Sequence, residues 1–177
     1  MTEQLRLILP TAEYMWEISA YRQEFLDHGD SMDGCGPLRR NPDPMEWLAK
    51  VDAFAHAETV PSGWVQTTQF LCVRENDRRL VGMIQVRHRF NEFLEKYAGH
   101  IGYSVRPSER KKGYAAWMLN TVKPYCRKIG LEKILVCCLT GNEASRKVIL
   151  KNGGVYDGTV HEPEGNRDLE RYWITLS

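Results

Sequence analysis

The residues best suited to chemistry lie in one stretch, residues 99–116, which reads GHIGYSVRPSERKKGYAA. A short strand leads through a turn marked by Pro107 to a basic segment, and Gly113 then opens a long helix. The first turn of a helix has backbone N–H groups without partners and a positive dipole end, and a glycine there lets a phosphate approach the backbone. The pattern indicates an anion site. The alternative is an ordinary strand-to-helix connection whose basic residues face water.

The composition limits the classes of protein and of partner to which such a site could belong. A chain of 177 residues with 42% hydrophobic and 27% charged residues suits one globular domain, which we expect to cover residues 1–177. The net charge of +1 produces no overall positive electrostatic field that would attract nucleic acid. No apolar run approaches the ~20 residues needed to span a bilayer, and residues 1–16 lack a basic-then-apolar leader. We therefore expect no nucleic-acid or membrane partner and a cytoplasmic location.

The cysteines give little sign of chemistry. There are five, and none forms a CxxC pair, which indicates reduced thiols and no metal site. A nucleophilic Cys–His pair is the functional alternative. Cys137 and Cys138 lie in an apolar segment, where a buried small side chain is the usual explanation.

The first third of the chain predicts one strand, two helices and a loop. Residues 5–9 form a short apolar strand, and apolar positions at three- and four-residue steps predict a helix from residue 11 that stops at Gly29. A second helix is expected over residues 45–57. Between the helices, residues 30–44 are rich in glycine and proline and read as a loop suited to substrate contact.

The middle of the chain predicts a β-hairpin, with arms 68–74 and 80–90 around a polar turn. Strict alternation in the second arm predicts its two faces. One face would carry Val81, Met83, Gln85, Arg87 and Arg89, and the other Gly82, Ile84, Val86, His88 and Phe90.

The last third predicts a strand, helix, strand order. Residues 101–105 and 134–139 are strands, and a helix from residue 115 to Gly130, kinked at Pro124, lies between them. This order predicts a right-handed crossover and parallel pairing of the two strands. A short helix over 142–151 and a hairpin with arms 155–160 and 170–175 complete the chain. The expected class is α+β, with a mixed sheet and helices on both faces.

Three separated pieces of the sequence resemble the GCN5-related N-acetyltransferase (GNAT) family. Residues 110–115 match its Arg/Gln-x-x-Gly-x-Gly/Ala signature, and residues 101–107 are similar to its fourth strand and the turn that follows. Asn142 and Ser145, with a glycine at 153, resemble its Asn-x-x-Ser helix. The chain also looks like a bacterial subgroup of poorly characterised predicted acetyltransferases. The resemblance implies a mostly antiparallel sheet whose central parallel pair is splayed.

The resemblance also implies acetyl-CoA as the cosubstrate, with no metal. Its pyrophosphate would meet the N–H groups of residues 111–115 and the charge of Arg110. The pantetheine arm would follow the fourth strand, with the thioester carbonyl near the N–H of Val105 or Tyr103. The implied acetyl-CoA-binding residues are Tyr103, Ser104, Val105, Arg110, Lys111, Lys112, Gly113, Tyr114, Ala115, Asn142 and Ser145. Asn142 has a plainer alternative, as a helix-start residue without a ligand.

Family members transfer acetyl directly to an amine, which needs a base and often an acid. Many place a Tyr as the acid where this chain has Ile149. Tyr156 is a weaker candidate for the acid, with a hairpin or core tyrosine as the alternative. His100 is the best-placed candidate base because its ordinary pKa is near 6.5, although a surface histidine is the plainer reading. Glu92, Glu95, His88 or a water relay could replace it.

The acceptor lies outside these motifs. The family fold would shape its pocket from residues 27–40 and 91–98, where Asp27, Asp30 and Asp33 could attract a small-molecule, peptide or protein amine. A homodimer is left open. Because the expected Tyr is missing, a non-catalytic CoA-binding or regulatory module is the alternative function. Nucleic-acid binding through the basic residues is disfavoured by the near-zero net charge. Those residues are Arg106, Arg110, Lys111, Lys112, Lys123, Arg127 and Lys128.

Overall fold

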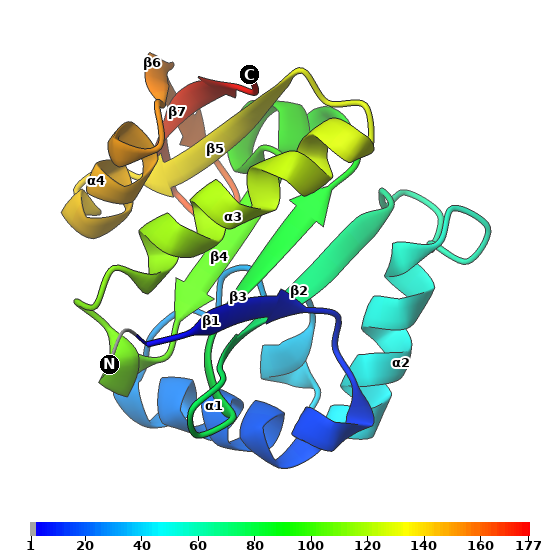
Figure 1. Cartoon of the computed structure of the whole chain (residues 1–177). Coiled ribbons are helices and arrows are strands. Elements are labelled where there is room, and N and C mark those ends of the chain that lie inside the picture. The colour runs from blue at the N-terminus through cyan, green and yellow to red at the C-terminus, as the bar shows by residue number, and fades with distance from the viewer. Residues whose placement is uncertain (1–2) are drawn as a thin grey trace.

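Residues 3–177, which the computed structural model describes, form a seven-stranded sheet with helices on both faces (Figure 1). The strand order is β1-β2-β3-β4-β5-β7-β6, and every neighbouring pair is antiparallel except β4 and β5. The strands are β1 (Leu5–Ile8), β2 (Thr67–Arg74), β3 (Arg79–Arg87), β4 (Ile101–Val105), β5 (Lys133–Leu139), β6 (Val155–Glu162) and β7 (Arg167–Thr175). The helices are α1 (Met15–His28), α2 (Pro44–Ala55), α3 (Tyr114–Lys128) and α4 (Glu143–Lys151).

Local sequence signals account for several helix ends. The helix α1 ends at Gly29, which takes the left-handed conformation (φ +68°) that glycine adopts without strain. Asp43 caps α2 by accepting a hydrogen bond from the Met45 amide, with Pro44 at the first helical position. Short helical turns lie between the larger elements, at Ala12–Tyr14, Leu38–Arg40, Leu94–Ala98 and Pro107–Glu109. The predicted helices are thus confirmed; the largest difference is at the start of the first helix, predicted at residue 11, where the helical turn Ala12–Tyr14 precedes α1 at Met15.

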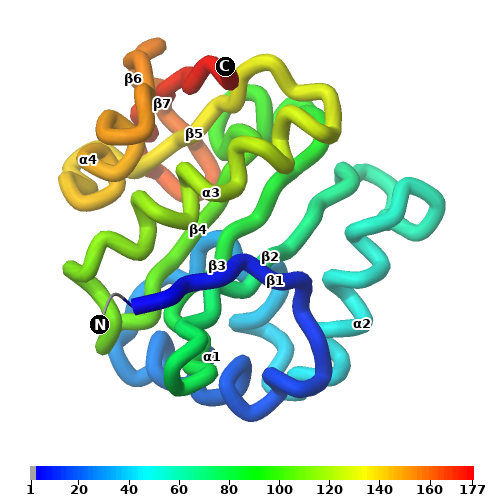
Figure 2. The backbone as a smooth tube through the Cα atoms, in the orientation of Figure 1, coloured from blue at the N-terminus to red at the C-terminus, as the bar shows by residue number. Residues whose placement is uncertain are grey.

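Two apolar clusters cover the two faces of the sheet. On one face, Met118, Leu119 and Val122 of α3 pack against β3, β4, β5 and β7. On the other face, α1 and α2 bury a second cluster that includes Phe25 and Trp47. Figure 2 shows the resulting path: the N-terminal half builds the part around α1 and α2, while β5, β6, β7 and α4 form the opposite end. The predicted fold class, a mixed sheet with helices on both faces, is confirmed.

The faces of β3 differ from the prediction at one residue. Val81 was expected to share a face with Met83, but it packs in the α3-side cluster, whereas Met83 packs against α1 and α2. The cause is a β-bulge: the partner strand pairs Val73 with Leu80 and Cys72 with Gly82, so Val81 is the extra residue. The strict alternation predicted for this arm was therefore wrong at Val81.

The predicted parallel pairing of β4 and β5 is confirmed, but it is very short, since the two strands pair in register only at Ile101 and Val136. The last hairpin is also confirmed, with longer arms than predicted. No helix within residues 3–177 combines the length and the apolar character needed to cross a membrane. In the same part of the chain, no three His, Cys, Asp or Glu side chains converge as a metal site.

Candidate functional site

The edge of β4 that faces β5 is open along most of its length. The Arg87 amide donates to the His100 carbonyl (2.8 Å) and the Arg106 amide donates to the Val81 carbonyl (2.9 Å). Because backbone groups alternate in direction along a strand, the even-numbered residues of β4 face β3, and Tyr103 and Val105 face β5. Within the described residues, these two lie beyond the single β4–β5 pair. Their amides therefore border a gap between the strands, which we call the splay.

The basic turn beside the splay presents backbone amides to open space. Gly113 is the N-cap of α3 with φ +83°, and a Cβ added to it would meet no atom within 4 Å. The amides of Tyr114, Ala115 and Ala116 occupy the first turn of α3, where helix amides have no intrahelical acceptor. The geometry matches an anion site at a helix N-terminus. The Tyr114 side chain points inward, with its hydroxyl bonded to Glu3 and Arg74, so only its backbone faces this site.

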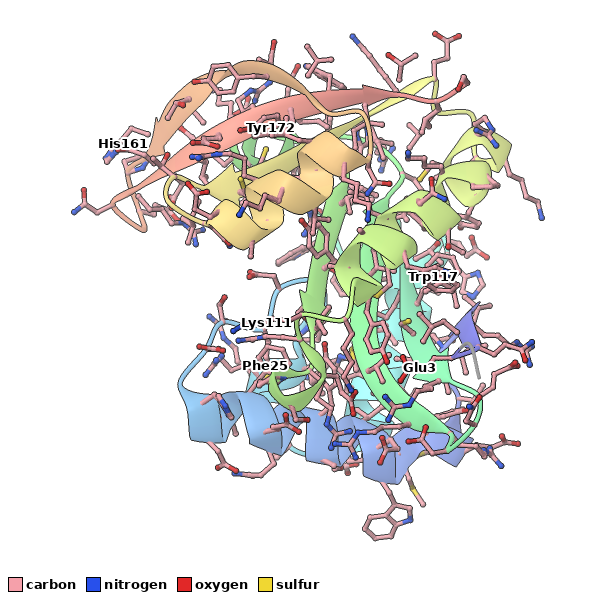
Figure 3. The ribbon with its side chains drawn as sticks, turned by 60° about the vertical axis from the view of Figure 1, so that its left-hand side comes forward. Glu3, Phe25, Lys111, Trp117, His161 and Tyr172 are labelled. Atoms are coloured by element: carbon pink, nitrogen blue, oxygen red, sulfur yellow. The ribbon has the colours of Figure 1, made fainter. Side chains whose placement is uncertain are left out.

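The three basic side chains of this turn differ in their charge balance. Arg110 pairs with Asp30 (2.6 Å) and also donates to the Val105 carbonyl (3.2 Å). Lys112 pairs with Glu109 (2.7 Å). Among residues 3–177, Lys111 has no carboxylate within ion-pair distance, and it is exposed (Figure 3). The unneutralised positive charge of the turn is therefore carried by Lys111, which the sequence alone does not distinguish from its neighbours.

A buried ion-pair network holds the turn in place. Arg106, at the end of β4, bonds to Glu24 (2.6 Å) and Glu17 (3.0 Å) of α1. Glu24 also accepts a hydrogen bond from the Ser108 amide (2.6 Å). The Glu109 carboxylate, buried at the next turn, accepts from Arg74 of β2 (2.8 Å). These contacts fix the approach to α3 on both sides, and sequence reasoning missed them because the partners lie 35 to 89 positions apart.

The start of α4 closes the splay from the α3 side. Asn142 accepts a hydrogen bond from the Ser145 amide (3.1 Å), so its side-chain oxygen acts as the helix cap. The hydroxyls of Ser145 and Tyr103 are hydrogen-bonded at 2.6 Å, which links β4 to α4 across the gap. Burial raises the pKa of Tyr103, and the phenol stays protonated at neutral pH. The structure thus brings together Tyr103, Asn142 and Ser145 of the predicted set.

A second polar cluster anchors α4 to β7. Glu170 accepts hydrogen bonds from Arg146 (2.9 Å) and from the Tyr172 hydroxyl (2.6 Å). The Cys138 thiol, at the end of β5, lies 3.9 Å from the same carboxylate. Hydrogen bonds from Arg146 and Tyr172 lower the pKa of Glu170. Sequence reasoning missed this cluster, since only the pairing of Cys138 with Glu170 in the sheet brings its members together.

His100 does not have the geometry of a base. The residue is 5% exposed, and its Nδ1 accepts a hydrogen bond from the Leu135 amide (2.9 Å). Burial, with a smaller effect of the nearby Arg87, lowers its pKa to about 4. The neutral ring then carries its proton on Nε2, and its one lone pair is already used. The prediction of His100 as the base therefore needs correction.

The other predicted residues lie apart. Tyr156 of β6 is 57% exposed, with its hydroxyl bonded to Thr159 (2.6 Å). Glu92 is exposed on the loop between β3 and β4. The Ser104 hydroxyl lies on the α1 side of the sheet, bonded to the Tyr21 hydroxyl (2.9 Å), and the Ser104 backbone faces β3. The structure therefore places Ser104 away from the splay, against its prediction as a cofactor contact, and joins neither Glu92 nor Tyr156 to it by a hydrogen bond.

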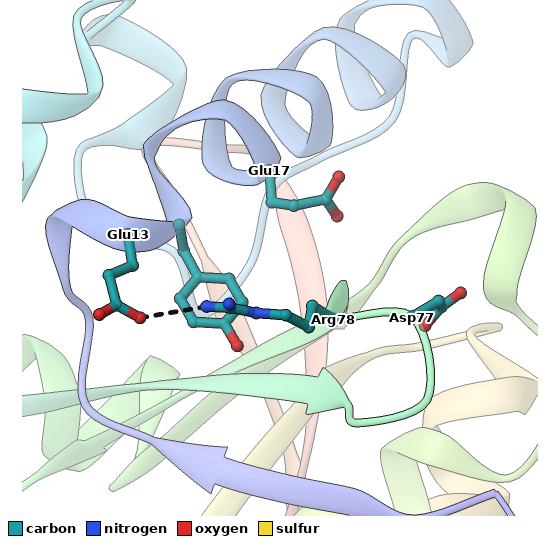
Figure 4. A pocket seen from close by; sticks show the side chains of 5 residues that line it. Glu13, Glu17, Asp77 and Arg78 are labelled. Carbon is teal, nitrogen blue, oxygen red and sulfur yellow. Dashed lines mark hydrogen bonds and ion pairs between the residues drawn. The ribbon is translucent and has the colours of Figure 1, made fainter.

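A shallow surface pocket lies elsewhere, where the chain entering α1 meets the β2–β3 turn (Figure 4). Arg78 lies over the Tyr14 ring (5.6 Å to its centroid) and pairs with Glu13 at 3.1 Å. Glu17 accepts from the Leu80 amide and from Arg106. The pocket residues Glu13, Glu17 and Arg78 do not belong to β4, β5 or the basic turn, and Glu17 is connected to the end of β4 through Arg106.

Known proteins share both sequence and fold with this chain. The family model of the acetyltransferase (GNAT) domain matches residues 24–155. An uncharacterized N-acetyltransferase of Bacillus subtilis (strain 168), YoaA, is 29% identical over 91 residues, which are 50% of this chain and 49% of that protein. The chain thus aligns with only half the length of this relative.

Two solved structures have the same fold. The ribosomal-protein-S5-alanine acetyltransferase of Vibrio fischeri superposes with a TM-score of 0.76 at 18% identity, covering 100% of this chain and 96% of that one. The microcin C7 self-immunity acetyltransferase MccE, solved with acetyl-CoA and AMP, gives 0.73 at 16% identity, over 99% and 94% of the two chains. Since the family model covers most of the sequence and the splayed sheet accompanies it, the chain belongs to the GNAT family of acetyltransferases.

Proposed function

We propose that the protein, acting as one domain over residues 1–177, transfers an acetyl group from acetyl-CoA to a primary amine within a ternary complex. The observation that carries this proposal is the splay beside the basic turn: open amides of Tyr103 and Val105 next to an exposed helix N-terminus. Family membership supports the acetyltransferase chemistry. MccE, which has the same fold, is named as a complex with acetyl-CoA.

The open groups fit the parts of acetyl-CoA in order. The pyrophosphate would bind the amides from Lys111 to Ala115, with Lys111 supplying a charge that no carboxylate of residues 3–177 neutralises and Arg110 and Lys112 holding the turn. The empty space in the Cβ direction of Gly113 leaves room for the phosphates. The pantetheine arm would then pair with the β5-facing backbone of Tyr103 and Val105. Asn142 and Ser145 would border it from α4.

In the transfer, the amine nitrogen attacks the thioester carbonyl carbon, the C–N bond forms and the C–S bond breaks. The amide of Val105 or Tyr103 would stabilise the oxyanion. The departing thiolate needs a proton, and the hydroxyl pair of Tyr103 and Ser145 spans the splay. Ile149, fully buried, occupies the position where many family members have the acid. Since His100 has no free lone pair, we propose that a water relay carries away the amine proton.

Two glycines at the ends of α3 provide a matched test. Gly113 and Gly130 have φ of +83° and +91°, and a Cβ on either meets open space. Gly113→Gln and Gly130→Gln should therefore destabilise the fold equally, by about 1 kcal/mol each. Only Gly113→Gln should weaken acetyl-CoA binding measured by calorimetry, by about tenfold or more. Equal binding by both variants would contradict the placement of the pyrophosphate.

A non-catalytic CoA-binding module is the second candidate, favoured by Ile149 in place of the usual acid. Release of CoA in the presence of a panel of primary amines separates the two functions. Amine-dependent release supports the acetyltransferase. If acetyl-CoA binds but no amine causes release of CoA, the result supports the non-catalytic module. If acetyl-CoA does not bind, both candidate functions are wrong.

A further inference from the structure

Arg87 places a guanidinium on the face of the splay opposite α4. It is the last residue of β3, and its Nη1 donates to the carbonyls of Ala98 (3.1 Å) and Gly99 (3.3 Å). Its Nη2 lies 3.1 Å from the position that a Cβ on Gly102 would take. The side chain therefore reaches beneath β4 toward the splay, over a residue that has no side chain of its own.

The charge of Arg87 is not neutralised within residues 3–177, where no carboxylate lies within ion-pair distance of it. Two other arginines with little exposure differ, since Arg106 pairs with two glutamates and Arg171 pairs with Asp157 at 3.3 Å. Burial lowers the pKa of Arg87, with smaller opposing effects of Cys137 and Asp33. Two backbone carbonyls accept hydrogen bonds from this partly buried cation but do not neutralise its charge, so an anion from outside the chain would stabilise it.

The loop between α1 and α2 sits against this guanidinium. Gly34 has φ +68°, and a Cβ on it would lie 2.3 Å from the carbonyl oxygen of Gly102. Gln69 donates to the Gly34 carbonyl (2.8 Å) and holds the loop down. Asp33, the neighbour of Gly34 in the chain, is exposed, and it lies near Arg87 because the Gly34 amide nitrogen and the Arg87 Nη2 are 3.2 Å and 3.1 Å from the same Cβ position of Gly102. A cation and an anion thus flank the splay on this face without pairing with each other.

This is also the face from which an acceptor would approach. With the pantetheine arm on the edge of β4, the Tyr103–Ser145 contact closes the α4 side. On the opposite side, Gly102 has no side chain, and the Arg87 Nη2 and the Gly34 amide nitrogen lie 3.1 Å and 3.2 Å from the position of its missing Cβ, so these two groups form the wall there. Of the three aspartates predicted to attract an amine, Asp30 is neutralised by Arg110. Asp27 and Asp33 keep their charge and, among residues 3–177, accept side-chain hydrogen bonds only from neutral groups, Gln23 (2.8 Å) and the Ser31 hydroxyl (2.9 Å). Of these two, Asp33 adjoins Gly34, whose backbone lies against Gly102 on the Arg87 side of β4.

We propose that Arg87 and Asp33 select an acceptor amine that carries a carboxylate, with Arg87 binding the carboxylate and Asp33 attracting the ammonium. This rests on the proposed acetyltransferase function and assigns its substrate class. A guanidinium binds a carboxylate in a directed, charge-assisted manner, which a purely cationic acceptor could not exploit. The carboxylate can belong to a free α-amino acid or to an acidic side chain beside a peptide N-terminus.

Matched acceptors test the proposal. One pair is leucine and leucinamide, and the other is Ala-Asp-amide and Ala-Asn-amide, which together separate the two carboxylate sources. We expect kcat/KM to favour the carboxylate in at least one pair by roughly tenfold to a hundredfold. In Arg87→Gln this preference should fall to about twofold or less, while kcat/KM for the neutral partner and KM for acetyl-CoA change little. If Arg87 had only a structural role, Arg87→Gln would lower kcat/KM for both members of a pair by the same factor.

The control is Arg167→Gln, which removes the same charge from the exposed β6–β7 hairpin and should leave the preference intact. Turnover of both pairs by the unaltered protein without preference overturns this inference and leaves the proposed function standing. If no amine is acetylated, calorimetry with the enzyme–CoA complex and the same pairs decides. Tighter binding of the carboxylate member supports the site while the proposed function fails, and equal or absent binding overturns the site.

Discussion

The ion pair between Glu24 and Arg106 should make the part of the molecule around the basic turn sensitive to acid. Glu24 is 19% exposed, and it joins α1 both to Arg106 and to the amide of Ser108, at the start of the turn into α3. Arg106 is 6% exposed and keeps a second carboxylate, Glu17. Replacing Glu24 with Gln removes one charge from this network, while the side-chain shape is preserved.

The size of the effect follows from the pKa of Glu24. Partial burial raises this pKa, but hydrogen bonds from Arg106 and Ser108 outweigh burial and lower it from 4.5 to about 2. That difference corresponds to about 3 kcal/mol of folding free energy. Because the pKa is lower in the folded state, the stabilisation is fully present above pH 4.5 and is lost as the pH falls toward about 2.

Urea unfolding of Glu24→Gln and of the unaltered protein, between about pH 7 and pH 3, measures this contribution. We expect a deficit of about 3 kcal/mol near neutral pH that shrinks below about pH 4. The control is Glu13→Gln, on the segment just before α1, whose pair with Arg78 is exposed and worth less than about 1 kcal/mol. A deficit that stays constant over this pH range would refute the linkage argument.

Three further predictions follow from single contacts. Gly34→Ala should cost about 2–4 kcal/mol in thermal unfolding because its Cβ meets backbone, whereas Gly29→Ala, at the same φ but in open space, should cost about 1 kcal/mol. Tyr103→Phe should lower kcat about tenfold or more, with KM for acetyl-CoA unchanged; an unchanged kcat would remove Tyr103 from proton transfer. The pKa of His100 is lower in the folded state, about 4, than in the unfolded state, about 6.5, so this histidine lowers the free energy of unfolding as the pH falls from 6.5 to about 4. In His100→Asn, the free energy of unfolding should therefore fall less over this pH range.

The sequence predicted the backbone of the site better than its charges. The basic turn and Gly113 were expected from local composition, and the helix N-terminus lies where the pattern indicated. The charge balance was not predictable, because it depends on the acidic partners Asp30 and Glu109. Glu109 lies next to Arg110 in the chain and resembles a solvated residue, yet its side chain is only 6% exposed. Its burial depends on Arg74, a residue of another strand.

The role of His100 shows why the catalytic residues were harder to predict than the fold. A histidine at a strand end has the ordinary pKa of a base, and nothing local shows which group its ring meets. In the structure, its backbone amide donates to the Leu135 carbonyl (2.8 Å), and its ring accepts from the Leu135 amide. The ring thus takes the place of a backbone acceptor where β4 meets β5. Just beyond Ile101 the strands lose their pairing, so we infer that His100 helps to set the point where the splay begins.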